Sequence, residues 1–363
     1  MSQTTADNKK SLNLDHKIAD PIFVTGFMHS ATTLTQSVLG RHSQVFSGGG
    51  ETRHFTHLSV LEAKYPDLND DYVLRDYIIY LLRVICTGYG RTNIYHTDKD
   101  SLDVIESCGL GEEDVDQLFE LAANNRDHAA LLSTAYDYLT TRSGKTRWLD
   151  KSPSYIMIVD DLLTRFPGAK VIMLVRDPRD ILASKLRRSK KKGNYDPVWD
   201  TLSWRAAVRA GDSARMNYPE QVIRVRYEDM VVEPEREYRR ICHFLDLPYE
   251  KGMLQVSWTN TSIEGLKGSG IGTGAMGKWR GTLPENDVFI CQQLAKGEMV
   301  ENNYFLEPIS PGARLKSPII LGRSTGNLVT RLRKKWMRGG KDHLLNGVNS
   351  YRMRLRALNK TDN

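Results

Sequence analysis

The sequence predicts an α/β fold in which helices flank a mostly parallel central sheet. Two runs carry this prediction, the β-branched and aromatic run from Ile22 to Thr25 and the continuous apolar run from Val171 to Val175, and each is followed by a short stretch of small or polar residues and then a helical pattern. Uninterrupted apolar runs of this length are typical of parallel strands that are covered on both faces. We therefore expect the two runs to be neighbouring inner strands.

A helical insertion is predicted between about residues 60 and 140, where apolar residues recur at helical spacing. One such stripe consists of Tyr72, Leu74, Tyr77, Ile78, Leu81 and Leu82. Stripes of this kind are far more often core than ligand contacts. We expect the insertion to pack on the sheet and to help build a cleft.

The chain is expected to form one large domain over residues 21–309, between a flexible lead over residues 1–20 and a basic, helical extension over residues 310–363. In the extension, Leu328, Leu332 and Trp336 could share one helical face among basic residues. A helix that is packed on the domain or solvated is the favoured interpretation. Contact with a membrane surface is the alternative.

The 363 residues carry a formal net charge of +7, and 40% of them are hydrophobic. This is the composition of a globular protein. The excess of basic residues favours anionic partners but does not indicate which kind. The first 20 residues are polar and predict neither a secretion signal nor a membrane span. The four cysteines are far apart and include no CxxC pair, which argues against a zinc site. We expect a soluble protein without a metal and without a nucleic-acid partner.

The first local signal for function is the loop from Gly26 to Thr33. A strand, a tight loop of small residues and a helix together aim backbone N–H groups at an anion, and the helix dipole adds to the attraction. The loop nearly spells the phosphate-binding pattern Gly-x-x-x-x-Gly-Lys-[Ser/Thr], but Ala31 replaces the second glycine and Thr32 the lysine. An ordinary ATPase is therefore disfavoured, and a strand-to-helix turn without a ligand is the structural alternative.

The run GFMHSATTL resembles the 5′-phosphosulfate loop of sulfotransferases, which use 3′-phosphoadenosine 5′-phosphosulfate (PAPS). The family pattern is Gly-x-Pro-[Arg/Lys]-Ser-Gly-Thr-Thr, so Met28 stands for the proline, His29 for the basic residue and Ala31 for the second glycine. The resemblance implies a P-loop-like sheet. It also implies that His29 is a catalytic donor and that the phosphosulfate is bound by Ser30, Ala31, Thr32 and Thr33.

A second signal follows the strand that ends at Val175. Arg176 comes at its carboxyl end, and Ser184 and Arg188 lie four residues apart, on one face of the helix that follows. Two guanidinium groups and a hydroxyl that converge make a good phosphate clamp. The run resembles the sulfotransferase element in which a strand-end arginine and a serine eight positions later hold the 3′-phosphate of PAPS. This implies that role for Arg176 and Ser184, with Arg188 beside them.

Two further runs resemble the family in the same order along the chain. Lys151, in RWLDKSPSYI, matches a family lysine that precedes Ser-Pro or Asp-Pro. The match implies that Lys151 meets the negative charge that develops on the leaving phosphate. The run VIRVRYEDM resembles a family strand and implies that Tyr227 lies near the nucleotide.

The glycine-rich stretch 260–281 predicts a mobile closing loop. Its Lys278 and Trp279 resemble a family Lys-Trp pair that lies over the nucleotide, which implies a cofactor-binding role for both. Tyrosyl-protein sulfotransferases have a catalytic serine just before that pair, where this chain has Gly277. That contribution is therefore not expected here.

Glu51 is the expected general base. Three glycines at 48–50 precede it and allow the backbone to approach the transferring group, and the string Gly-Gly-Glu-Thr-Arg resembles tyrosyl-protein sulfotransferases. A carboxylate has a reference pKa of about 4.3, so it needs a raised pKa or a tight hydrogen bond to the acceptor. His54 and His57 on the same segment are the competing bases. A glutamate that merely starts a helix is the structural alternative.

Together these features predict an enzyme that moves a sulfuryl group from PAPS to an acceptor hydroxyl and releases 3′-phosphoadenosine 5′-phosphate (PAP). A carbohydrate or small metabolite is the expected acceptor, and a protein tyrosine is the runner-up. A P-loop kinase or NTPase and a non-catalytic nucleotide- or polyanion-binding protein are the rival classes. The expected compartment is the cytoplasm, or the Golgi lumen if a membrane anchor has been removed. The sequence indicates no oligomeric state.

Overall fold

The computed structural model describes residues 18–88, 105–189, 195–259, 267–315, 320, 322, 324 and 352–358. Within them the predicted α/β class with a parallel central sheet is confirmed. The strands of this sheet are ordered β2-β3-β1-β4-β5, and every pairing is parallel. Their bounds are β1 (Ala19–Gly26), β2 (Val45–Ser47), β3 (Arg147–Lys151), β4 (Lys170–Val175) and β5 (Val222–Arg226). A separate antiparallel pair consists of β6 (Ser257–Thr259) and β7 (Lys267–Ser269).

The two apolar runs are neighbours at the centre of the sheet, as predicted, because β1 pairs with β4. Successive residues of a strand point to opposite faces. Phe23 and Met173 therefore belong to one core cluster, whereas Val24 and Ile172 belong to the other. The runs 22–24 and 171–175 of these strands are apolar without interruption because each face of the sheet buries its own half of the side chains.

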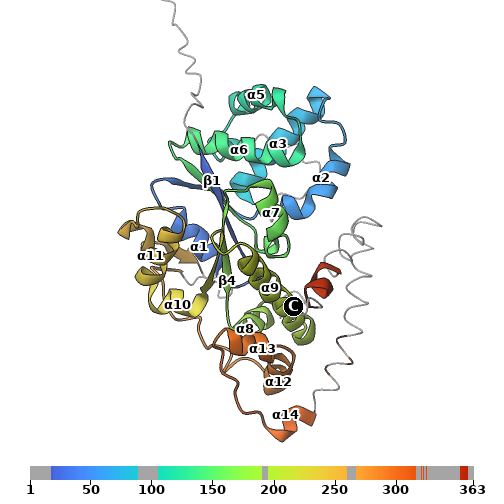
Figure 1. Ribbon diagram of the computed structural model, residues 1–363, viewed down its shortest axis with the longest axis vertical. Helices are drawn as coiled ribbons and strands as arrows, with labels where there is room; N and C mark the ends of the chain where they lie inside the picture. Colours follow the sequence, from blue (N-terminus) through green and yellow to red (C-terminus); the bar gives the residue numbers. More distant parts are fainter. Residues whose placement is uncertain are drawn as a thin grey trace, which may run out of the picture.

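Helices cover both faces of the sheet (Figure 1). One face packs against α1 (Thr32–Leu39), α10 (Tyr227–Val232) and α11 (Pro234–Phe244). The other face packs against α7 (Val159–Arg165) and α9 (Pro197–Asn217). Four further helices contact α9 or α12 and are α8 (Pro178–Ser189), α12 (Glu285–Leu294), α13 (Lys296–Glu301) and α14 (Pro311–Leu315).

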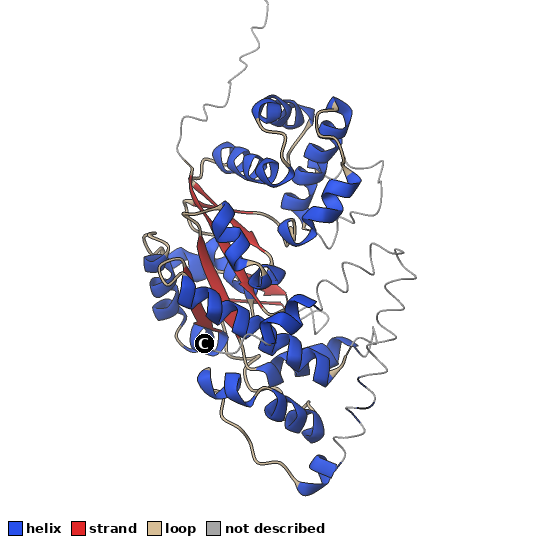
Figure 2. Cartoon of the chain, turned by 45° about the vertical axis from the view of Figure 1, so that its right-hand side comes forward, coloured by secondary structure: helices blue, strands red, loops and turns tan. Residues whose placement is uncertain are grey.

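The stretch for which a helical insertion is predicted forms a group of helices at one end of the molecule (Figure 2). They are α2 (Leu58–Lys64), α3 (Asp71–Thr87), α5 (Glu112–Leu121) and α6 (His128–Arg142). Leu74 and Tyr77 of the predicted stripe are buried on α3, but Tyr72 is 83% exposed and is not part of the core. Asp70 caps α3 by accepting hydrogen bonds from the backbone N–H groups of Tyr72 and Val73 at 2.9 and 3.1 Å, an interaction that typically contributes about 1 kcal/mol.

Residues 352–358 are helical and pack on α9. Arg209 Nη1 donates to Leu358 O at 2.9 Å, and Arg354 Nη1 donates to Ser203 Oγ at 3.2 Å. The helix predicted around Leu332 and most of the predicted flexible lead lie outside the described residues. None of the helices in the described ranges is long and apolar enough to cross a membrane.

Candidate active site

The site residues predicted from the sequence follow neighbouring strands at one edge of the sheet. β1 continues into the loop 27–31, and β3 ends at Lys151, which pairs in register with Val24 of β1. Arg176 follows β4, and Tyr227 follows β5. Because the strands are parallel, all these positions lie at the carboxyl edge, where open α/β sheets bind their ligands.

The loop between β1 and α1 has a backbone conformation that suits an anion. His29 and Ala31 have positive φ values of 68° and 70°, in the left-handed region. Ser30 between them is fully buried, and its Oγ has no hydrogen-bond partner among the described residues. A buried hydroxyl without a partner is costly, so Ser30 fits a ligand oxygen. Thr32, which is buried, and Thr33, which is exposed, begin α1, whose first N–H groups have no partner within the helix.

Arg176 connects this loop to two other elements. Its Nη1 donates to His29 O at 3.1 Å, and its Nη2 donates to Ala275 O at 2.6 Å. The guanidinium lies 4.2 Å from the ring centroid of Tyr227, a cation–π contact. Nε is buried and has no partner within the part of the chain that the structure describes. Arg176 is thus fixed in place and keeps one buried donor for an anion.

Helix α8 brings the other predicted clamp residues to the same edge. Ser184 is 8% exposed, and one turn later Arg188 places Nη1 at 3.4 Å from His29 Nδ1. An arginine can only donate, so Nδ1 of His29 accepts in this contact. The structure therefore joins the clamp helix to the predicted phosphosulfate loop through Arg188.

His29 is uncharged at neutral pH. Burial, reinforced by the positive charges of Arg188, Lys185 and Arg176, lowers its pKa to about 4. The imidazole thus differs from the permanently charged arginine or lysine of the family pattern. Any help that His29 gives to the departing phosphate comes from a neutral N–H group.

Glu51 lies between two cations. Arg53 Nε donates to Glu51 Oε2 at 2.7 Å, and Lys151 Nζ lies 3.4 Å from Oε1. Burial acts to raise the pKa of Glu51, but the charges and hydrogen bonds of Lys151 and Arg53 outweigh burial and lower it below its ordinary value. For Lys151, burial lowers the pKa and Glu51 opposes that effect. Of the two routes expected for this base, a raised pKa is therefore absent, which leaves a tight hydrogen bond to the acceptor.

The three glycines before Glu51 allow this backbone to pack closely against another part of the chain. A Cβ at Gly48 would lie 2.5 Å from Ile85 O, and one at Gly49 would lie 1.8 Å from Cys86 O. Gly49 N also donates to Ile85 O at 2.8 Å. The glycines thus let this backbone pack against the last turn of α3.

The two competing histidines have different surroundings. His54 is fully buried, and its Nε2 lies 2.9 Å from His128 O in the helical group. Burial lowers the pKa of His54 to about 3, which fits a structural role and argues against a base. His57 is half-buried, with Nδ1 at 3.0 Å from Arg53 O, and stays a competitor of Glu51.

A buried network that the sequence analysis missed ties the Glu51 segment to the end of β3. Asp150 is fully buried and accepts hydrogen bonds from Thr52 Oγ1 at 2.7 Å and from Tyr155 OH at 3.0 Å. Ser152 Oγ accepts one from Arg53 N at 2.9 Å. Burial raises the pKa of Asp150 to about 6, against the opposing effect of these hydrogen bonds. The one available signal was the position of Asp150, directly before Lys151 at a strand end.

Trp279 is a packing residue in this structure, whereas its neighbour Lys278 is exposed. The indole is 5% exposed, and the guanidinium carbons of Arg179 and Arg280 lie 4.2 and 4.6 Å from its ring centroid. Gly277 before the pair has a positive φ of 68°, and a Cβ there would lie 3.2 Å from Arg280 Nη1. A serine at this position would therefore be strained.

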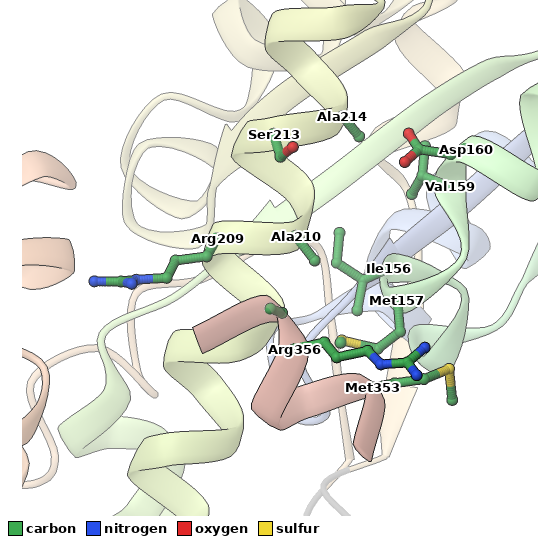
Figure 3. A pocket seen from close by; sticks show the side chains of 11 residues that line it. Ile156, Met157, Val159, Asp160, Arg209, Ala210, Ser213, Ala214, Met353 and Arg356 are labelled. Carbon is green, nitrogen blue, oxygen red and sulfur yellow. The ribbon is translucent and has the colours of Figure 1, made fainter. Parts of the chain in front are cut away.

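A hollow elsewhere in the molecule does not belong to this site. Figure 3 shows a cavity of about 180 Å³ between η3 (Pro153–Met157), α7, α9 and the helical residues 352–358. Ile156, Arg209 and Met353 are among the residues that line it. No predicted site residue of the described part lines this cavity. It lies where the C-terminal helical residues pack on the domain.

Protein-tyrosine sulfotransferases are among the known proteins with similar sequences. Protein-tyrosine sulfotransferase A of Caenorhabditis elegans is 28% identical over 156 residues, which is 39% of this chain and 41% of that protein. Protein-tyrosine sulfotransferase 1 of Danio rerio is 28% identical over 108 residues, which is 29% of this chain and 30% of that protein. The chain thus spans less than half the length of these curated relatives.

Solved structures and the family pattern agree on the fold. The sulfotransferase domain from the curacin biosynthetic pathway has a TM-score of 0.51 and 19% identity, and the match covers 80% of this chain and 100% of that chain. The sulfotransferase domain of the Synechococcus PCC 7002 olefin synthase has a TM-score of 0.50 and 22% identity, covering 78% and 96%. The sequence pattern of the sulfotransferase family matches residues 21–251, which are more than half of this chain, and the chain therefore belongs to the sulfotransferase family.

Proposed function

We propose that the protein transfers a sulfuryl group from PAPS to the hydroxyl of an acceptor, with Glu51 as the general base and Lys151 at the leaving phosphate. The contact between Glu51 and Lys151 supports this most, because it lies at the end of β3, next to the strand that leads into the Ser30 loop. A base and a cation in this arrangement serve the two ends of one in-line displacement.

The residues present fit PAPS, which supplies the sulfuryl group when it is bound. Ser30 Oγ and Arg176 Nε are buried donors without a partner among the described residues, and an anion would satisfy both. In this proposal the loop that carries Ser30 binds the 5′-phosphosulfate, and Arg176 with Ser184 binds the 3′-phosphate. Tyr227 beneath Arg176 then supports the nucleotide indirectly.

The chemistry needs one proton acceptor and one site of positive charge. Glu51 accepts the proton of the acceptor hydroxyl while that oxygen bonds to sulfur and the bond from sulfur to the 5′-phosphate oxygen breaks. Negative charge develops on the leaving phosphate, and the Lys151 ammonium stabilises it. The Lys151 side chain is 4% exposed, and a fixed charge shielded from water acts more strongly than one in solvent.

The acceptor class has two candidates. The hydroxyl of a carbohydrate or small metabolite is the class that we expect from the sequence. A tyrosine hydroxyl is the second candidate, and the names of the nematode and fish relatives favour it.

The test combines labelled PAPS with separate pools of glycans, small hydroxyl metabolites and tyrosine peptides, and mass spectrometry detects the sulfated product. Glu51→Gln keeps the shape of the side chain and removes the base, so turnover should fall by about a hundredfold or more. PAP binding should persist in that variant. Glu120→Gln, the same change at an exposed position of α5, is the matched control and should keep full activity.

Three outcomes contradict parts of the proposal. Wild-type protein that binds PAP but sulfates no pool would favour the non-catalytic alternative. Full activity in Glu51→Gln combined with an inactive His57→Ala would make His57 the base. A requirement for Mg²⁺ together with transfer of phosphate would favour an NTPase.

A further inference from the structure

A buried carboxylate outside the predicted site holds the turn at residues 275–279, which carries Lys278. Asp180 Oδ2 accepts a hydrogen bond from Gly277 N at 2.7 Å, and Oδ1 accepts one from Trp279 N at 3.0 Å. The side chain belongs to a residue that is only 2% exposed. Both carboxylate oxygens thus bind backbone N–H groups of one turn, and such charge-assisted bonds are about twice as strong as neutral ones.

The same turn is also attached to the proposed phosphate clamp. Arg176 Nη2 donates to Ala275 O, and its Nη1 donates to His29 O in the phosphosulfate loop. The turn therefore has two attachments, one to the first turn of α8 through Asp180 and one to Arg176. Movement of the turn would change the surroundings of Arg176 and, through it, of the loop.

The indole of Trp279 packs against a side chain of α8 that is itself held in place. Arg179 lies over the ring of Trp279, and its own guanidinium is fixed by Asp177 Oδ2 at 2.7 Å and by Gln292 Oε1 at 3.0 Å. Gly277 has the positive φ that the turn requires. The turn is thus built to rest on α8 in one orientation.

A simpler explanation accounts for only part of this arrangement. Asp180 lies in the first turn of α8, where an acidic residue interacts favourably with the helix dipole. An acid that serves only the helix does not need its two oxygens bonded to residues 97 and 99 positions away in the sequence. Those contacts point to the turn.

We propose that Asp180 is a positioning residue of the nucleotide site. It fixes the 275–279 turn on α8, so that Arg176 stays at the 3′-phosphate position and Lys278 is presented beside it. The inference rests on the proposed function for the identity of the nucleotide, but the attachment of the turn can be measured without any nucleotide.

The first experiment is limited trypsin digestion of the full chain without nucleotide, with the cuts after Lys278 and Arg280 quantified by mass spectrometry. Asp180→Ala should be cut there at least tenfold faster than wild type, since both backbone contacts are lost. Asp180→Asn should be intermediate, because its amide oxygen can still accept one bond. Asp70→Ala is the matched control, because Asp70 also accepts two backbone N–H groups, at the start of α3. Its cutting rate after Lys278 should equal that of wild type.

The second experiment measures PAP binding by calorimetry with the same variants. Asp180→Ala should raise the Kd for PAP about tenfold, which corresponds to about 1.4 kcal/mol. Asp180→Asn should show a smaller loss, and Asp70→Ala none. If Asp180→Ala does not fold, the asparagine variant carries both measurements.

The outcomes separate this inference from the proposed function. Wild-type protein that does not bind PAP overturns the proposed function, while the digestion still shows whether Asp180 holds the turn. If the wild-type protein binds PAP and both Asp180 variants bind it as tightly as wild type does, the positioning role is overturned, even if the turn is cut faster. Unchanged cutting in both variants overturns the attachment itself.

Discussion

Replacement of Arg176 by alanine tests the proposed 3′-phosphate contact. The residue is 7% exposed, two of its nitrogens donate to backbone carbonyls, and Nε has no partner among the described residues. A hydrogen bond to a charged group contributes about 1.5–3 kcal/mol. Loss of such a bond to the 3′-phosphate should therefore raise the Kd for PAP about ten- to hundredfold.

An indirect effect of the same substitution has to be separated from the direct one. Arg176 also holds His29 O and Ala275 O, so its loss disturbs the site for any adenine nucleotide. Adenosine 5′-phosphate lacks the 3′-phosphate and reports only this disturbance. The loss of affinity for PAP should exceed the loss for adenosine 5′-phosphate by about tenfold or more.

Calorimetric titration of wild type and variants with both nucleotides is the assay. Arg176→Lys should give an intermediate loss for PAP, because lysine keeps the charge but not the planar fork. Arg236→Ala removes an exposed arginine of α11 and serves as the matched control. Equal losses for both nucleotides in Arg176→Ala would refute the assignment of the 3′-phosphate to this residue.

Four further predictions concern Lys151, the base and the loop. Lys151→Ala should lower kcat more than it raises KM for PAPS, because the charge that Lys151 meets develops only in the transition state; a change in KM alone would make it a binding residue. The pKa values of Lys151 and Glu51 are both lowered, and a plot of kcat/KM against pH should show both shifts. On the alkaline side kcat/KM should fall as Lys151 loses its proton, at a pH below the usual pKa of a lysine. On the acid side it should fall only where Glu51 gains a proton, at a pH below the usual pKa of a glutamate. With a pKa of about 4 in the ligand-free protein, His29 should cause no inflection in kcat/KM between about pH 6 and 8; an inflection there that disappears in His29→Asn would contradict its neutral state. Ala31→Gly should raise the stability by about 1 kcal/mol in thermal unfolding, because glycine relieves the left-handed backbone; a lower melting temperature would show that packing of the Ala31 methyl group outweighs that strain.

The parts of the fold that could be predicted depend on local patterns. The inner strands β1 and β4 carry the uninterrupted apolar runs 22–24 and 171–175 because helices cover both of their faces, and these runs leave a clear signal in the sequence. The positions of Arg176 and Lys151 could be predicted for a related reason. A residue that follows a parallel strand must lie at the carboxyl edge, whatever the order of the strands.

Contacts between distant segments left no comparable signal. The run of three glycines indicates that another group approaches the backbone, but not that this group is the last turn of α3. Asp150 and Asp180 resemble ordinary polar residues in the sequence, since their function depends on which backbone is packed against them. The pair Lys278 and Trp279 could be recognised, but the direction in which the indole points is set by Arg179 on another element.

The loop that carries Ser30 and the residue Arg176, which are proposed to hold the sulfuryl donor, follow β1 and β4. The segment with the proposed base is held from two sides, by the buried network at the end of β3 and by the contact of Gly49 N with Ile85 O in the last turn of the helix α3. One residue more or less in that helix would rotate the receiving carbonyl by about 100° and move the base relative to an unchanged donor site. Acceptor preference in such a protein can therefore diverge through the length and tilt of α3, without any substitution among the residues that would bind the nucleotide.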